Sequence, residues 1–227
     1  MNEISVIIPT FQHARTIASC LDSLCSQTLL PKELIVLDDG STDETKKIVT
    51  SYPVSVVYQY QQHAGAPMAR NRGAELATGT FLLFCDADIV TFPTMLEDMY
   101  RVFMDHPEVD VCYSGFLWGN RVFKSRPFDV PALQVQNYLH TTSLIRTTAF
   151  PGFDPFLKRF QDWDLWLTMV ERGSTAFALD QVLFRVQDVP GRKGISTWMP
   201  SIFYKIPWNI IGWKPQTMKD FERARDI

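Results

Sequence analysis

Short apolar segments that alternate with helix-like segments constrain the fold of this chain more than any other feature. The apolar segments cover residues 4–9, 33–41, 54–60, 80–88 and 109–115. The helix-like segments between them cover residues 14–27, about 41–48, 67–77 and 93–103. Since strands joined by helices of these lengths form right-handed crossovers, the pattern predicts an α/β fold with a Rossmann-like, mainly parallel central sheet flanked by helices.

Two helix boundaries carry their own signals. Ser41 and Glu44 have the spacing of a capping box, so we expect the second helix to begin there. Pro67 near the start of the third helix and Gly79 beyond its end are typical of helix termini. The second half of the chain is less regular, and we expect a strand over 140–146 there.

Length and composition fit one folded domain. The chain has 227 residues, of which 46% are hydrophobic and 21% charged, and its formal net charge is −3. This balance does not suggest a nucleic-acid partner. We assign residues 1–190 to a single domain, with halves over 1–115 and 116–190, and residues 191–227 to a C-terminal tail rich in aromatic and basic residues.

Cysteine spacing and the N-terminal segment indicate a cytoplasmic protein. The four cysteines lack any CxxC spacing, and we expect them to be reduced thiols. The four histidines show no metal-ligand spacing, and we assign them no role. Residues 1–9 do not resemble a signal peptide, and no apolar run approaches the roughly 20 residues that span a bilayer.

Three polar segments follow predicted parallel strands. They are Pro9–Gln12, Asp38–Ser41 and Asp86–Asp88. Because ligands of such sheets bind beyond the carboxyl ends of the strands, we expect these three segments to form one rim.

The segment Asp86–Ala87–Asp88 ends an apolar strand with two acids. If the strand continues through it, both carboxylates lie on one face, and Ala87 points away. Two hard oxygen ligands suit Mg²⁺ or Mn²⁺ that is shared with substrate phosphates. The alternative is a loop that merely follows a strand. An acid at Asp38–Asp39 could likewise read a base edge or a ribose hydroxyl.

Arg70 and Arg72 lie on the helix that leads to the acidic strand. They face the phosphates of a ligand in one interpretation and are solvated surface residues in the other. The chain contains neither GxxxxGK[ST] nor GxGxxG, so neither a P-loop nor a dinucleotide fingerprint holds a nucleotide here.

Three ordered motifs carry a family resemblance. They are "SVIIPTFQHARTIASCLDSLCSQTLLPKELIVLDDGSTDET", "GAPMARNRGAELATGTFLLFCDADI" and "QDWDLWL". With these motifs, residues 3–185 resemble the family-two inverting nucleotide-sugar glycosyltransferases with the GT-A fold. The resemblance makes 1–115 the nucleotide-sugar-binding half and 116–190 the acceptor-side half.

The resemblance also implies roles for individual residues. The donor-binding set that it implies is Pro9, Thr10, Phe11, Asp39, Arg70, Asn71, Asp86 and Ala87. Thr10 and Phe11 would lie against the nucleobase, which Asp39 would hydrogen-bond. Asp88, with Asp86, would bind a divalent metal, Mn²⁺ or Mg²⁺. Asp162 matches the catalytic base of the family, while Gln161 replaces the acid that usually precedes it.

The reaction that the resemblance implies is a single displacement with inversion at the anomeric carbon. The donor would be a nucleotide-diphosphate sugar, UDP by family habit, and the acceptor a carbohydrate or a lipid-linked acceptor, as in polysaccharide or glycolipid biosynthesis. One alternative is a nucleotide-sugar-binding protein with lost or weak transfer activity. This alternative is suggested by Gln161, which stands where the family usually has an acid. A nucleotidyltransferase is disfavoured, because "PTFQHARTIAS" contains no glycine for a phosphate loop.

The helix expected over 161–172 and the chain after it refine these roles. An apolar stripe of Trp163, Trp166, Leu167 and Val170 would place Asp162 and Asp164 on opposite flanks, so that only one faces the donor. Family members often have a histidine after the last core strands, where this chain has Gln187. The tail segment 201–216 either packs on the domain or meets a membrane surface peripherally.

Overall fold

A computed structural model of the chain describes residues 3–52 and 56–187. The strands are β1 Ile4–Thr10, β2 Glu33–Asp38, β3 Val56–Tyr60, β4 Phe81–Phe84, β5 Ile89–Thr91, β6 Val111–Trp118, β7 Arg121–Phe123, β8 Leu144–Arg146 and β9 Ala176–Val186. The helices are α1 Ile17–Cys25, α2 Thr45–Thr50, α3 Ala66–Leu76, α4 Met95–Asp105, α5 Val130–Val135 and α6 Gln161–Glu171, with a 3₁₀ turn at Thr147–Ala149.

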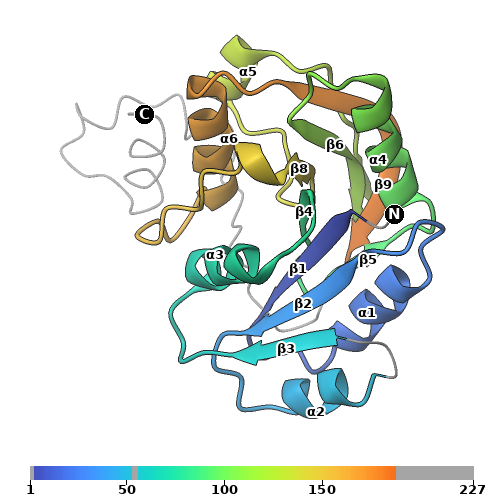
Figure 1. Cartoon of the computed structure of the whole chain (residues 1–227), viewed down its shortest axis with the longest axis vertical. Coiled ribbons are helices and arrows are strands. Elements are labelled where there is room, and N and C mark those ends of the chain that lie inside the picture. Colours follow the sequence, from blue (N-terminus) through green and yellow to red (C-terminus); the bar gives the residue numbers. More distant parts are fainter. Residues whose placement is uncertain (1–2, 53–55, 188–227) are drawn as a thin grey trace.

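One curved nine-stranded sheet forms the centre of the molecule (Figure 1). Its order is β3-β2-β1-β4-β8-β6-β9-β5, and β7 pairs with β6. The four strands β3, β2, β1 and β4 are parallel, as are β6 and β9, whereas β8 is antiparallel to both its neighbours. The predicted fold class, a single α/β domain with a mainly parallel central sheet flanked by helices, is confirmed.

Helices cover both faces of the sheet, and strand β1 shows why. Its side chains alternate between two apolar clusters: Ile4, Val6 and Ile8 pack with α1 and α4, while Ile7 packs on the other face, with α6. Helix α3 lies on that second face, against β1 and β2 (Figure 1). All seven residues of β1 are buried, which explains its mainly apolar sequence, in which Ser5 and Thr10 are the polar members.

The close approach of α3 to the sheet depends on glycine. A Cβ at Gly73 would overlap Ile7 Cγ2 and would lie 3.2 Å from Leu37 Cδ2. The predicted end signal at Gly79 has a related cause, because a Cβ there would lie 2.6 Å from Glu3 O. Both glycines therefore allow backbone segments to approach closely.

The predicted capping box at the start of α2 is wrong. The helix begins at Thr45, and its N-cap residue Glu44 makes no side-chain capping hydrogen bond. Asp43 instead accepts hydrogen bonds from the backbone N–H and the hydroxyl of Thr45, at 3.1 and 2.5 Å. Ser41 is engaged elsewhere, since its Oγ accepts from the backbone N–H of Gln12 at 2.9 Å.

The structure contains elements that the sequence did not predict, most of them in the second half of the chain. They are the short strands β5 and β7, the long strand β9 and helix α5. The strand expected over 140–146 is also shorter, because only Leu144–Arg146 has strand geometry. Strand β9 has a mixed pattern of burial, with only two of its eleven residues buried, so its sequence lacks a clear period.

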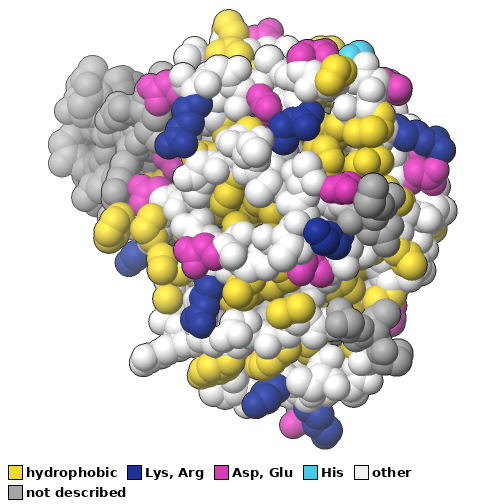
Figure 2. Space-filling view, in the orientation of Figure 1, with side chains coloured by type: hydrophobic (Ala, Val, Ile, Leu, Met, Phe, Trp, Pro, Cys, Tyr) yellow, Lys and Arg dark blue, Asp and Glu magenta, His cyan; other side chains and the backbone are white. Residues whose placement is uncertain are grey.

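Cysteine state and surface character can also be compared with expectation. All four cysteines are free thiols, as predicted; Cys20, Cys85 and Cys112 are buried and Cys25 is partly exposed. On the face drawn in Figure 2, acidic and basic side chains are interspersed rather than gathered by sign. Within residues 3–52 and 56–187, no helix combines the length and apolarity that crossing a membrane requires. The tail 191–227, including 201–216, lies outside the described residues.

Candidate donor and catalytic site

The three polar segments that follow β1, β2 and β4 form one rim, as predicted. The backbone N–H of Asp39 donates to Thr10 O at 2.8 Å, which joins the ends of β1 and β2. On the other side of β1, the backbone N–H of Cys85 donates to Ile7 O at 2.9 Å. A side-chain hydrogen bond also joins the segments after β1 and β2, because Gln12 Nε2 donates to Thr42 Oγ1 at 2.8 Å.

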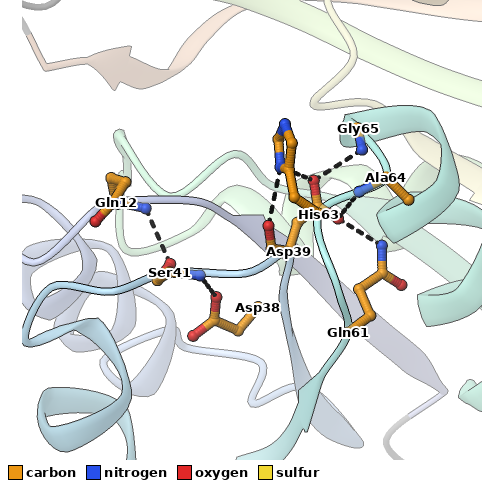
Figure 3. Close-up of polar contacts among 8 residues, drawn as sticks. All are labelled: Gln12, Asp38, Asp39, Ser41, Gln61, His63, Ala64 and Gly65. Carbon is orange, nitrogen blue, oxygen red and sulfur yellow. Dashed lines mark hydrogen bonds and ion pairs between the residues drawn. The ribbon is translucent and has the colours of Figure 1, made fainter.

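Asp39 occupies the centre of this rim, where its carboxylate accepts three hydrogen bonds and also faces His63 (Figure 3). Oδ1 accepts from Gln61 Nε2 at 2.7 Å and from the backbone N–H of Ala64 at 2.8 Å. Oδ2 accepts from the backbone N–H of Gly65 at 2.9 Å and lies 2.9 Å from His63 Nδ1. Since a carboxylate has about four acceptor sites, segment 61–65 uses most of those of Asp39. Its role toward a nucleobase stays a prediction.

Asp38 has a structural role beside it. Its carboxylate accepts from the backbone N–H of Ser41 at 2.7 Å and from the Tyr58 hydroxyl at 2.6 Å. The side chain is completely buried. Burial, followed by the hydrogen bond to Asp38, raises the pKa of Tyr58. Asp38 therefore fixes the turn after β2, and Asp39 fixes the start of α3.

Phe11 and His63 form an aromatic pair beside Asp39. Their ring centroids lie 4.4 Å apart with 31° between the planes, and Phe11 is 38% exposed. The neighbouring donor-set residues Pro9 and Thr10 are buried at the end of β1. Sequence reasoning missed His63. Its signal was its place in "QQHAGAP", between a strand and the glycine that precedes a helix.

The Asp86–Asp88 segment is a turn rather than a strand end. Strand β4 ends at Phe84, and the backbone N–H of Ile89 donates to Asp86 O at 2.9 Å. The assumed strand geometry of the two acids is therefore wrong. The turn still buries Ala87 completely and leaves Asp86 and Asp88 partly exposed at the rim.

The chemistry of the two acids fits a divalent cation. Carboxylate oxygens are hard ligands of the kind that Mn²⁺ and Mg²⁺ take. Among the described residues, no third His, Cys, Asp or Glu joins them in a cluster. Such a site suits an ion that keeps several waters and takes substrate phosphates as further ligands.

Arg70 connects the acidic turn with the start of α6. Its Nη2 donates to Asp86 Oδ1 at 2.7 Å, and its Nη1 donates to Gln161 Oε1 at 2.9 Å. The guanidinium also lies over the ring of Phe153, at 5.2 Å from the centroid. Desolvation acts to raise the pKa of Asp86, but the charge and hydrogen bond of Arg70 outweigh it and hold that pKa below its ordinary value. Arg72, by contrast, is exposed.

Asn71 holds the segment that leads to α6. Its Nδ2 donates to Phe153 O at 2.8 Å, and its Oδ1 accepts from the backbone N–H of Phe153 at 2.7 Å. In this structure the amide therefore fixes a loop. Its predicted proximity to the donor stays a prediction.

Asp162 lies in the first turn of α6. Its Oδ2 accepts from Asn137 Nδ2 at 2.9 Å, and its Oδ1 accepts from the backbone N–H of Trp163 at 2.9 Å. Desolvation raises the pKa of Asp162, although these hydrogen bonds and Arg70 oppose that effect. Sequence reasoning missed Asn137, which lies in an irregular segment without a motif.

The buried face of α6 is wider than predicted. Asp164, Leu165 and Met169 are buried, whereas the predicted Leu167 and Val170 are only partly buried. The reason is that segment 133–139 covers the helix, as shown by hydrogen bonds from the indole N–H groups of Trp163 and Trp166 to its carbonyl oxygens. Asp164 is only 6% exposed, so Asp162 is the more exposed of the two acids.

Polar atoms without partners gather at this site. Within the described residues, the buried side-chain nitrogen and oxygen atoms that lack a hydrogen-bond partner are Thr10 Oγ1, Arg70 Nε, Thr142 Oγ1 and Gln187 Nε2. Thr10 and Arg70 belong to the predicted donor set, and the backbone N–H of Gln187 donates to Asp88 O at 2.8 Å. Since buried polar groups are normally hydrogen-bonded, this concentration indicates a site for a polar ligand.

Backbone strain occurs beside the same segments. Among the described non-glycine residues, those with positive φ are Gln12, at 59°, and Phe160, at 58°. Gln12 follows Phe11, and Phe160 precedes Gln161 and Asp162. Non-glycine residues held in the left-handed region are often found at functional sites.

A family model described as "Glycosyl transferase family 2" matches residues 5–164. The chain belongs to this family. The part of the chain that matches glycosyl transferase family 2 includes the rim, the acidic turn and the first turn of α6. It therefore contains every site residue that the sequence predicted.

Curated relatives in the family are glycosyltransferases by name. The uncharacterized glycosyltransferase YibD of Escherichia coli K12 is 38% identical over 120 residues, 52% of this chain and 35% of that protein. A PGL/p-HBAD biosynthesis glycosyltransferase of Mycobacterium bovis BCG is 32% identical over 170 residues, 70% of this chain. This chain spans 66% of the length of the mycobacterial protein.

Solved structures share the fold. S. aureus TarS 1-349 in complex with UDP-GlcNAc matches with a TM-score of 0.69 and 22% identity, over 99% of this chain and 70% of that one. The mannosyltransferase PcManGT of Pyrobaculum calidifontis, in complex with GDP-Man and Mn²⁺, matches with a TM-score of 0.63 and 21% identity, over 84% of this chain and 58% of that one. The predicted GT-A type fold is confirmed.

Proposed function

We propose that this chain is a metal-dependent inverting glycosyltransferase that moves a sugar from a nucleotide-diphosphate sugar to an acceptor hydroxyl. The observation that carries the proposal is the link Asp86–Arg70–Gln161. It joins the acidic turn after β4 to the first turn of α6, where Asp162 lies. The link thus places the residue that precedes the predicted base in one hydrogen-bond network with the predicted donor-binding acid Asp86, although 76 residues separate Asp86 from Asp162 in the sequence.

The donor that we propose first is a UDP-sugar. TarS was solved with UDP-GlcNAc, and PcManGT with GDP-Man and Mn²⁺, which supports UDP or GDP as the nucleotide and a divalent cation as the cofactor. The acceptor that we propose is a carbohydrate or a lipid-linked molecule, in polysaccharide or glycolipid biosynthesis. The name of the mycobacterial relative, a PGL/p-HBAD biosynthesis glycosyltransferase, supports a biosynthetic role.

The residues divide the reaction between them. Asp162 removes the proton from the acceptor hydroxyl as that oxygen attacks the anomeric carbon. Because burial raises the pKa of Asp162, its carboxylate is a stronger base than an exposed aspartate. When bound at Asp88 and Asp86, a divalent cation supplies positive charge that favours departure of the nucleoside diphosphate. Arg70 keeps Asp86 ionised for that task.

A second candidate is a nucleotide-sugar-binding protein with weak transfer, since Gln161 replaces an acid beside the proposed base. The contacts of Gln161 argue against a damaged site. Its Oε1 accepts from Arg70, and its Nε2 donates to Leu157 O at 3.0 Å, so both ends of the amide are used. Release of nucleoside diphosphate from a sugar nucleotide separates the two candidates.

Thermal denaturation with added nucleotides tests the donor site. UDP, GDP, dTDP and CMP are each added with Mn²⁺, Mg²⁺ or EDTA to the wild-type protein and to Asp88→Ala. A ligand at about 100 times its Kd adds roughly 2.7 kcal/mol to the free energy of unfolding, so its effect on Tm is measurable. We expect UDP with Mn²⁺ to raise the wild-type Tm and to have little effect on Asp88→Ala. No response to any nucleotide would contradict the proposal.

A further inference from the structure

His140 lies where three strands of the acceptor-side sheet converge. It precedes β8, close to the end of the β4–β8 pairing that leads to Asp86. Its ring packs between Phe116 of β6 and Phe184 of β9, with centroid distances of 4.8 and 4.9 Å. The two phenylalanines are register partners on neighbouring parallel strands. The orientation of the imidazole is therefore fixed by packing.

A backbone hydrogen bond fixes the tautomer of His140. The backbone N–H of Thr142 donates to Nδ1 at 3.0 Å. A nitrogen that accepts a hydrogen bond carries no proton, so the proton of the neutral ring is on Nε2. Among the described residues, no group accepts a hydrogen bond from Nε2–H.

The ring lies within the electrostatic reach of two groups of the proposed donor site. Desolvation lowers the pKa of His140 to about 4, Asp86 opposes that effect, and Arg70 adds to it. The charge interaction with His140 in turn acts to lower the pKa of Asp86. The imidazole is therefore neutral at physiological pH and neighbours the Arg70–Asp86 pair. A neutral donor at this place adds a hydrogen bond without placing a second cation beside Arg70.

We propose that His140 is a donor-binding residue, whose Nε2–H donates a hydrogen bond to an oxygen of the sugar–diphosphate portion of the nucleotide sugar. The inference rests on the proposed function. Packing and the hydrogen bond from Thr142 fix the ring, and Nε2–H, which has no acceptor among the described residues, is left available to a ligand.

Substitutions that differ in reach test this role. Gln can place an N–H near the position of Nε2, whereas Asn can replace the Nδ1 acceptor but does not reach as far. His140→Phe keeps an aromatic ring between the two phenylalanines and removes both nitrogens. The matched control is His106→Phe, because His106 also stacks on a phenylalanine, Phe177, at 4.8 Å, on the part of the chain that carries α4.

Isothermal titration calorimetry on the full chain with Mn²⁺ measures the Kd of UDP and of UDP-GlcNAc, or of GDP and GDP-mannose if the nucleotide panel selects GDP. We expect His140→Phe and His140→Asn to weaken binding about tenfold, as for the loss of one hydrogen bond, and His140→Gln and His106→Phe to stay within about threefold of wild type. A loss for both ligands assigns the bond to the diphosphate, and a loss for the sugar nucleotide alone assigns it to the sugar.

Three results would overturn the inference. Unchanged binding by His140→Phe or His140→Asn would exclude the hydrogen bond. An equal loss in His140→Gln would make packing, not donation, the cause. If wild type binds no nucleoside diphosphate, the proposed function fails and this inference fails with it, whereas wild-type binding with unaffected variants contradicts His140 alone.

Discussion

At the scale of residues, two carboxylates of the site have pKa values that are shifted in opposite directions. Desolvation acts on both, but Arg70 outweighs it at Asp86, whose pKa is lowered, and not at Asp162, whose pKa is raised. Asp86 is therefore ionised over a wide range of pH, while Asp162 holds a proton more readily. Divergent pKa values of this kind separate the roles of neighbouring acids.

The pH dependence of the free energy of unfolding should reveal that Asp162 is buried. Its pKa is raised in the folded state, so ionisation there costs free energy that the unfolded chain, with a pKa of about 3.9, does not incur. Below both pKa values the cost is absent, and it grows as the pH rises through the folded value. We therefore expect Asp162→Asn to gain stability relative to wild type as the pH rises from about 3.5 to 7. The free energy of unfolding of the variant minus that of wild type should increase over this range.

Denaturant unfolding of both proteins across that pH range measures this difference. The lost hydrogen bond between Asn137 and a carboxylate oxygen adds an offset that does not depend on pH. The trend is therefore the test. A difference that stays constant, or that falls as the pH rises, would show that the fold does not disfavour the ionised side chain.

Asp39 should matter for stability before any ligand binds. Asp39→Asn replaces one acceptor oxygen with an NH₂ group that faces donors of segment 61–65. Because a buried donor without a partner costs about 1–3 kcal/mol, we expect the free energy of unfolding to fall by that amount. Urea unfolding measures it, with Asp105→Asn, on the exposed end of α4, as a control that changes by less than about 0.5 kcal/mol. Equal stabilities would contradict the structural role of Asp39.

At the scale of elements, helix α3 connects the two halves of the site. Its N-terminus is held by Asp39, and its second turn carries Arg70, which reaches Asp86 and Gln161. The contact of Gly73 with β1 and β2 sets the distance between the helix and the sheet. The position of Arg70 therefore depends on a packing contact one turn away.

Gly73→Ala tests this dependence. Alanine is the better helix former by about 1 kcal/mol, but overpacking against Ile7 and Leu37 typically costs about 1–3 kcal/mol. We expect a net loss of about 1 kcal/mol in the free energy of unfolding and weaker nucleotide binding through the displaced Arg70. Glu75→Ala, an exposed change on the same helix, is the control. A more stable Gly73→Ala protein would show that propensity, not contact with the sheet, dominates here.

The elements also show what the sequence could and could not predict. Buried parallel strands such as β1 and β2 are mainly apolar runs, so their existence and order were predictable. The turn at Asp86–Asp88 was not, because the strand residues and the turn residues form one apolar run that ends in acids. The direction of β8 was equally unpredictable, since an isolated three-residue strand carries no signal of its orientation.

At the scale of the whole molecule, the site is assembled from segments that are far apart in the sequence. The family resemblance predicted which residues belong to it, and the structure connects Arg70 of the first half with Gln161 of the second. Sequence reasoning assigned no role to His63 and His140, because histidines without ligand spacing carry no motif. Their neighbours, Phe11 and Asp39 for one, Phe116 and Phe184 for the other, are brought together only by the fold.

The role of Asp162 as the catalytic base is best measured by release of nucleoside diphosphate from the selected sugar nucleotide, with acceptor glycans present, by wild type and Asp162→Asn. General base catalysis contributes about 10²–10⁴-fold, so we expect the Asp162→Asn rate to fall by at least about 100-fold while its Kd for the donor stays within about threefold of wild type. Turnover by Asp162→Asn at the wild-type rate would contradict the assignment of Asp162 as the catalytic base.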